Sequence, residues 1–138
     1  MMLQFTVAGA PKPKGSMRAF VPRGWTRPVL TSASGGLKAW EQAIQAVAQD
    51  HVVAYTTDPV RVRLRFALPR PKSLSRRAAR RPHVKRPDVD KLARAALDAL
   101  TGVVWKDDSQ VYALSAVKHY ARDDQPPHVT ISIATRES

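Results

Sequence analysis

Residues 87–102 read PDVDKLARAALDALTG, and the expected fold is organised around this stretch. Its apolar side chains recur at the spacing of one helix face: Val89, Leu92, Ala93, Ala96, Leu97 and Leu100. Pro87 keeps Arg86 out of helical geometry. The carboxylate of Asp88 or Asp90 can accept hydrogen bonds from the free N–H groups of the first turn, and Gly102 stands where a helix commonly ends. We therefore predict a helix here that packs one face into the core.

Acidic residues gather around this predicted helix although the whole chain is acid-poor, with 11 Asp and Glu against 23 Lys and Arg. Five of the acids lie within 21 residues of sequence: Asp88, Asp90, Asp98, Asp107 and Asp108. Clustered carboxylates repel one another unless a cation holds them, and hard cations such as Mg²⁺ prefer oxygen ligands. A divalent-metal site is the first hypothesis for this cluster, and capping aspartates without chemistry are the alternative.

The length and composition of the chain limit the other classes of function. A chain of 138 residues fits one domain, residues 1–138, with a modest core. No apolar run is long enough to span a bilayer, and the first residues lack a signal-peptide pattern, so we expect a cytoplasmic protein with no membrane partner. The absence of cysteine excludes disulfides, thiolate zinc sites and cysteine nucleophiles, and any metal must use oxygen or histidine ligands.

The formal net charge of +12 is typical of a polyanion binder, because Lys and Arg that neutralise phosphates release counterions. A basic ribosomal-type protein or a solvated basic surface is the alternative. One basic segment is the arm at residues 10–36, which we predict to be a loop because Pro, Gly and Ser are frequent in it. Phe20 and Trp25 could stack there on exposed bases, or tuck into the core of the protein.

A second basic segment covers residues 70–86. It contains eight basic residues and no acid: Arg70, Lys72, Arg76, Arg77, Arg80, Arg81, Lys85 and Arg86. We expect a disordered or weakly helical segment in the free protein that orders along phosphates when DNA binds.

Alternating apolar and polar residues predict strands at residues 3–7, 60–68, 111–119 and 129–133. In the second of these, Arg61, Arg63 and Arg65 form an outer row that suits a polyanion or is simply solvated. Apolar residues between Leu37 and Ala48 have the spacing of an amphipathic helix, which we predict to begin near Ser34 and to end by Asp50. We expect the last strand to pair with the strand before it, across a turn at 122–127. The predicted fold class is α/β (α+β), with a small mixed sheet of four or five strands and two main helices.

Three motifs carry a resemblance to a known family: KRPDVDKL at residues 85–92, LDALTG at 97–102 and KDDSQV at 106–111, with a later Lys118. They resemble the RusA family of Holliday junction endodeoxyribonucleases, whose pattern reads P-D-x-D-N-L-x-K, then D-A-L-x-G, then D-D-x-Q-[IV] and a downstream lysine. Two positions depart from that pattern. Lys91 replaces the usual asparagine, and Arg94 replaces the usual lysine.

The resemblance implies a RusA-like homodimer that cuts four-way branched DNA with Mg²⁺, or with Mn²⁺ as a substitute, and without a nucleotide cofactor. It also implies that Asp88, Asp90 and Asp108 are the metal-binding catalytic acids, with Asp107 as an adjacent metal candidate. Arg94 would act at the scissile phosphate in place of the family lysine, although a guanidinium cannot donate a proton near neutral pH. Such a protein is expected to be encoded by a bacterium or a phage.

The predicted DNA contacts combine the two basic segments with residues of the motifs. They are Lys12, Lys14, Arg76, Arg77, Arg80, Arg81, Lys85, Arg86, Lys91 and Lys118. Two alternative functions stay open. One is a junction-binding or branched-DNA-binding protein that has lost catalysis, supported by the departures at Lys91 and Arg94. The other is a nuclease of broader specificity that acts on flaps, forks or RNA.

Overall fold

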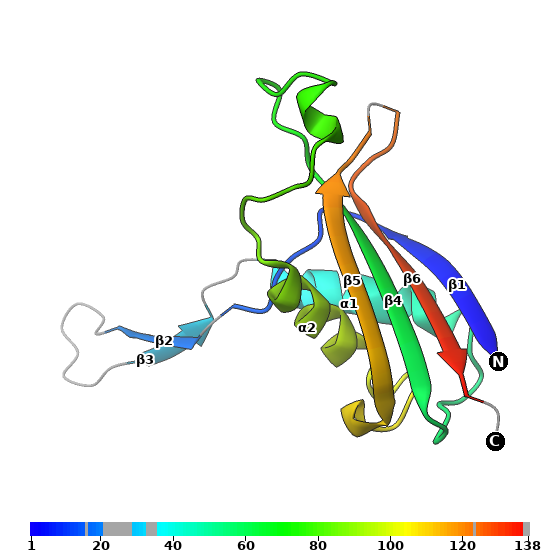
Figure 1. The fold of residues 1–138 in the computed structure, drawn as a ribbon. Helices are drawn as coiled ribbons and strands as arrows, with labels where there is room; N and C mark the ends of the chain where they lie inside the picture. The colour runs from blue at the N-terminus through cyan, green and yellow to red at the C-terminus, as the bar shows by residue number, and fades with distance from the viewer. Residues whose placement is uncertain (16, 21–28, 33–35, 123, 137–138) are drawn as a thin grey trace.

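The structure is a computed structural model, and it describes residues 1–15, 17–20, 29–32, 36–122 and 124–136. Its main sheet contains four strands: β1 (Met2–Ala8), β4 (Val60–Leu68), β5 (Val111–Tyr120) and β6 (His128–Thr135). Two α-helices, α1 (Leu37–Gln49) and α2 (Val89–Leu100), complete the framework (Figure 1). The predicted α+β class, with a small mixed sheet and two main helices, is confirmed.

The strands lie in the order β1-β6-β4-β5. Strand β6 is antiparallel to both of its neighbours, whereas β4 and β5 are parallel. The expectation that the last strand pairs with the one before it is therefore wrong. The chain passes from β4 through α2 to β5, and such a crossover places β5 beside β4 in parallel. The other side of β4 is then left for β6, so β5 and β6 follow each other in the chain but do not pair.

The prediction of a loop throughout residues 10–36 is also wrong in part. Strands β2 (Met17–Phe20) and β3 (Val29–Ser32) form an antiparallel two-stranded sheet that stands away from the main sheet in Figure 1. Trp25 and the side chain of Phe20, which were candidates for base stacking, lie outside the described residues.

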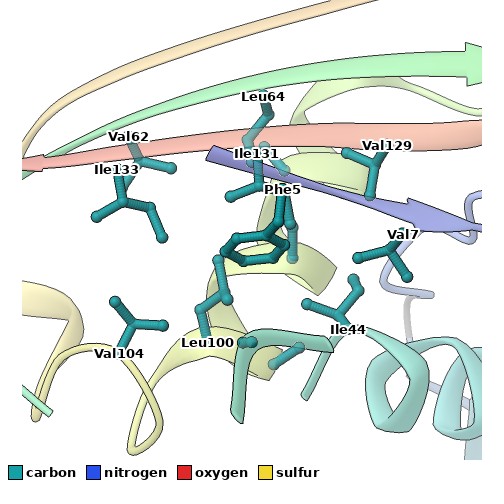
Figure 2. Close-up of a cluster of buried hydrophobic side chains, with 14 of the residues drawn as sticks. Phe5, Val7, Ile44, Val62, Leu64, Leu100, Val104, Val129, Ile131 and Ile133 are labelled. Atoms are coloured by element: carbon teal, nitrogen blue, oxygen red, sulfur yellow. The ribbon is translucent and has the colours of Figure 1, made fainter. Parts of the chain in front are cut away.

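The core lies between the sheet and the two helices, which cover the same face of it (Figure 1). Figure 2 shows Phe5 at its centre, between sheet residues such as Ile131 and the helix residues Ile44 and Leu100. Leu100 and Ile44 are completely buried, and burial of an aliphatic side chain of this size contributes about 1.5–3 kcal/mol. The apolar spacing seen in the sequence thus fixes which face of α2 meets the sheet.

The short elements outside this core are two 3₁₀-helices, η1 (Ala78–Arg80) in the basic segment and η2 (Asp108–Gln110) just before β5. The weak helical tendency expected in residues 70–86 therefore appears as a single short turn. Among the described residues, no helix is both long enough and apolar enough to cross a membrane.

Candidate active site

The first acidic pair lies at the start of α2. Asp88 occupies the N-cap position and its backbone carbonyl accepts from the N–H of Leu92 at 3.1 Å, but its side chain makes no capping hydrogen bond. Its carboxylate is exposed, with the Lys91 ammonium 3.9 Å away. Asp90 lies in the first turn and is exposed as well. Both acids therefore lie at the end of the helix where backbone N–H groups favour negative charge.

The segment that leads into Asp88 is held by Lys118 on β5. The Lys118 ammonium donates to the carbonyl oxygens of Lys85 at 2.5 Å and of Pro87 at 2.9 Å, and the peptide bond between Arg86 and Pro87 is cis. An ammonium bound to two carbonyls gives charge-assisted hydrogen bonds, which are stronger than neutral ones. In this structure Lys118 therefore positions the backbone next to the first acidic pair.

His83 supports the same segment from inside the protein. It is 7% exposed and its ring packs against Tyr120, with centroids 4.4 Å apart. Burial lowers the pKa of His83, and the nearby charge of Lys118 lowers it further. The imidazole is thus a neutral packing group beside Lys118.

The second acidic pair lies in the turn before β5. The Asp107 carboxylate accepts from the backbone N–H of Ser109 at 2.9 Å, and this hydrogen bond lowers the pKa of Asp107. Gln110 closes the turn, because its Oε1 accepts from the N–H of Asp107 at 2.8 Å while its Nε2 donates to the carbonyls of Thr56 and Asp58, each at 2.9 Å. Asp107 is thereby engaged in capping η2.

Asp108 is directed instead toward α2. Its Oδ1 accepts from the hydroxyl of Thr101, and that hydroxyl oxygen accepts from the indole N–H of Trp105 at 3.0 Å. Trp105 is completely buried, so the Thr101 hydroxyl links Asp108 to the core. The other carboxylate oxygen, Oδ2, lies 3.8 Å from the Arg94 guanidinium.

Arg94 lies on α2, one turn after Asp90, and pairs with Asp108 of the second acidic pair. Asp90 precedes it by four residues, so the two lie on neighbouring turns of one helix face, and Asp108 pairs with it from the turn before β5. The structure therefore docks the turn of residues 106–110 against the helix that carries Asp88 and Asp90. Among the described residues, however, no three acidic or histidine side chains converge closely enough to hold a metal ion.

The donor set fits a hard divalent cation in its chemistry. Asp88 and Asp90 are exposed carboxylates and Asp108 is half-buried, so all three offer the oxygen ligands that Mg²⁺ prefers. Asp107 fits less well, because its carboxylate already caps η2. Adjacent residues on an extended chain point to opposite sides, and Asp107 and Asp108 have separate partners.

A cleft of about 610 Å³ opens beside Asp88. Its charged lining comes from two separate parts of the chain: Lys12 and Lys14 at the base of the arm, and Arg86, Asp88 and Lys91 around the start of α2. Five of the predicted site residues are thus brought to one cleft. Arg76, Arg77, Arg80, Arg81 and Lys85 are exposed in the basic segment, outside this cleft.

Lys14 has a structural partnership within that cleft. Its ammonium lies 3.0 Å from Asp98 on α2 and 3.4 Å from Glu41 on α1, and its backbone N–H donates to the carbonyl of Lys91 at 2.9 Å. The hydrogen bond to Asp98 raises the pKa of Lys14. These contacts fasten the base of the arm to both helices, and contact of Lys14 with DNA stays a prediction.

Three residues of the site had no role assigned to them from the sequence: Thr101, Trp105 and Gln110. Gln110 belonged to the KDDSQV motif without an assigned role. The sequence signal for Thr101 was its place in LDALTG, where it follows a buried helix face. Its bond to Asp108 depends on the chain folding back between residues 101 and 108, which spacing alone does not specify.

Comparisons with known proteins bear on the origin of this arrangement. A family model described as Endodeoxyribonuclease RusA matches residues 10–134. The chain is also similar to a Bacillus subtilis (strain 168) protein described as "Uncharacterized protein YqaN", with 31% identity over 141 residues that span 95% of this chain and 94% of that protein. The family match covers all three motifs and Lys118.

Proposed function

The chain belongs to the RusA family of endodeoxyribonucleases, and from this premise we propose that it is a Mg²⁺-dependent enzyme that resolves four-way DNA junctions by paired symmetric nicks. The observation that carries the proposal is the contact of Asp108 with Arg94 on α2 and with Thr101 at the end of that helix. The N-terminus of the same helix carries Asp88 and Asp90. Carboxylates from two distant segments of an acid-poor chain are thereby attached to one helix, and Asp88 at its N-terminus borders the basic cleft.

Asp88, Asp90 and Asp108 are the residues that would hold Mg²⁺, with Mn²⁺ as a substitute. A bound divalent cation supplies an activated water and stabilises charge on the phosphate and the leaving oxygen. Thr101 holds the Asp108 carboxylate in place, and Arg94 places a fixed positive charge beside it that can also neutralise a phosphate. Lys12, Arg86 and Lys91 line the cleft next to Asp88 and are suited to contact the DNA backbone.

A homodimer fits this function because a four-way junction is two-fold symmetric. Two matched nicks need two equivalent active sites, which a closed pair of identical subunits provides. Recognition would then depend on the shape of the junction and the placement of its phosphates more than on base edges.

The test is cleavage of a mobile four-way junction by the wild type, by Asp90→Asn and by Asp50→Asn, each with Mg²⁺, with Mn²⁺ and with EDTA. Asp50 is an exposed acid at the end of α1, outside the site, so its variant has the same charge change and serves as a control. We expect symmetric nicks from the wild type and from Asp50→Asn, and at least about 1000-fold slower cleavage by Asp90→Asn, whose binding in EDTA is retained.

Three outcomes separate the alternatives. A wild type that binds junctions in EDTA and never cuts them with metal present is a binding protein without catalysis. Equal cleavage of junctions, forks, flaps and RNA indicates a nuclease of broader specificity. Full activity of Asp90→Asn contradicts the assignment of the catalytic acids.

A further inference from the structure

The face of the main sheet that turns away from the helices carries a row of arginines. Arg61, Arg63 and Arg65 alternate along β4 with buried residues and are all exposed. We refer to these three residues as the arginine row. Strand β4 is an inner strand of the sheet, so the row runs across the middle of the open face that Figure 1 presents to the viewer.

Three of the cross-strand neighbours of Arg63 and Arg65 are short and polar, and the fourth is Val117. Arg63 is flanked by Ser132 on β6 and Ser115 on β5, and Arg65 is flanked by Thr130 on β6. Small neighbours leave the guanidinium groups accessible, and hydroxyls can donate further hydrogen bonds to phosphate oxygens. The open face thus offers donors on three adjacent strands.

The charge of this face is not balanced within the sheet. Strands β1, β4, β5 and β6 contain no acidic residue, and within the described part of the chain no carboxylate forms an ion pair with Arg61, Arg63 or Arg65. Like charges two residues apart on a strand are separated by about 6.8 Å and repel one another. An anionic partner would remove this repulsion.

Two residues of the arginine row, Arg63 and Arg65, line a hollow in this face. A groove of about 1530 Å³ runs over this face, and Arg63, Arg65, Ser115, Thr130 and Ser132 contribute to its lining. The basic segment and the β5–β6 connection add Arg80 and Arg122 to the lining, and Asp124 is the one acid among its described lining residues. We refer to this hollow as the sheet groove.

We propose that the sheet groove is a second DNA-binding surface, which holds the backbone of a duplex arm on the side of the sheet opposite to α2 and the acidic site. This inference rests on the proposed function, because it takes the family substrate as the partner. One DNA strand carries a phosphate every ~3.4 Å along the duplex axis, so successive arginines of the row can neutralise separate phosphates. Surfaces on both faces of one sheet suit a branched molecule, whose arms diverge from a centre at the β5 edge.

The test is the salt dependence of binding to a short duplex and to a four-way junction, measured in EDTA so that cleavage plays no part. The test variant is Arg63→Gln/Arg65→Gln. The matched control is Lys38→Gln/Arg136→Gln, which removes the same charge at exposed positions that do not line the groove. We expect the slope of log K against log[salt] to fall in magnitude by about 1.8 for the test variant, which is the loss of two phosphate contacts. The control should keep the wild-type slope.

Further measurements keep the result unambiguous. Circular dichroism and thermal unfolding establish that each variant is folded, and Arg65→Gln alone should lower the slope by about 0.9. A slope for the test variant equal to that of the control would overturn the proposal. The proposal would also be overturned if the test variant changed its oligomeric state in sedimentation while its salt slope stayed at the wild-type value. That result would make the groove a contact between two copies of the chain. Because binding is measured without metal, a wild type that fails to cut junctions would refute the proposed function and leave this result intact.

Discussion

The two acidic pairs at the ends of α2 differ in how firmly the protein holds them. At the N-terminal end, the Asp88 side chain has no capping hydrogen bond, and the Lys91 ammonium lies 3.9 Å from its carboxylate. At the other end, Asp108 is bound by Thr101, which is anchored by buried Trp105, and its turn is closed by Gln110. One pair is fixed before any ligand arrives, and the other is fixed only through its backbone.

This difference suggests a division of roles. A half-buried carboxylate held by core residues keeps its position at no further entropic cost when a cation binds, whereas exposed carboxylates must lose rotamer freedom to join it. We therefore expect Asp108 to be the preformed carboxylate of the site, and Asp88 and Asp90 to take their final positions only when a ligand binds. The predictions below test this comparison, from the largest effect to the smallest.

Replacing Asp108, the carboxylate held by Thr101, should have the largest effect on the rate of cleavage. Asp108→Asn is expected to slow junction cleavage by at least about 1000-fold, because it removes a charge that nothing nearby replaces. Asp107→Asn is the matched control in the next position, and it should lose less than about tenfold in rate because Asp107 caps η2 instead. Single-turnover cleavage with Mg²⁺ measures both. Equal losses in the two variants would mean that the turn acts as one unit.

Removing the hydrogen bonds that hold the segment before α2 should mainly reduce the stability of the protein. Lys118→Met removes two charge-assisted hydrogen bonds to the carbonyls of Lys85 and Pro87, and the free energy of unfolding should fall by about 1.5–3 kcal/mol. Urea unfolding measures this loss, with exposed Lys106→Met as the control.

The same Lys118 variant decides between positioning and DNA contact. If Lys118 only positions the backbone, the salt slope of junction binding stays at the wild-type value. A slope smaller by about 0.9 with unchanged stability would instead assign it to a phosphate.

Removing the Thr101 hydroxyl that holds Asp108 should have a smaller effect on stability. Thr101→Val keeps the shape of the side chain but leaves the buried indole N–H of Trp105 without its acceptor, so the free energy of unfolding should fall by about 1–2 kcal/mol. The Mg²⁺ concentration needed for half-maximal cleavage should rise, because Asp108 loses its fixed position. Thr101→Ser retains the hydroxyl and should restore both properties. A Thr101→Val protein with the wild-type Mg²⁺ requirement would show that Asp108 does not depend on Thr101.

The smallest effect is expected at Lys14, where the ion pairs are partly exposed. Lys14→Met should lower the free energy of unfolding by less than about 1 kcal/mol. Contact with Asp98 raises the pKa of Lys14 above its usual value of 10.5, so this stabilisation is complete below pH 10.5 and is lost as the pH rises through the higher folded value. The difference between wild type and variant should therefore shrink only in strong alkali. A difference that persists unchanged there would contradict the ion-pair origin.

Much of this molecule could be predicted from local patterns. The spacing of apolar residues gave α2 between Asp88 and Gly102, and alternation gave β4 with its outward arginines. These patterns can be read from a sequence because the periods of helices and strands are properties of consecutive residues. The acidic motifs and the family that they resemble were equally visible, since each lies within a few consecutive residues.

Strand order could not be predicted in the same way. Which strand lies next to β4 depends on the crossover through α2 and on the packing of both helices against one face, and these are contacts between distant residues. The hairpin of β2 and β3 was missed because the frequent Pro, Gly and Ser residues of the arm outweighed its short strand signals.

By itself, the sequence determined α2, the acids around it and the arginine row, because each depends on residues that are close together in the chain. It also determined the excess of positive charge, which depends on composition alone. Only the tertiary structure decided that Thr101 and Arg94 contact Asp108, that Lys118 and Lys14 fasten the backbone around the site, and that Arg63 and Arg65 of the arginine row line a groove on the far face. The physical reason is that a hydrogen bond or ion pair forms wherever the fold brings two groups within reach, and core packing sets that proximity over long distances along the chain.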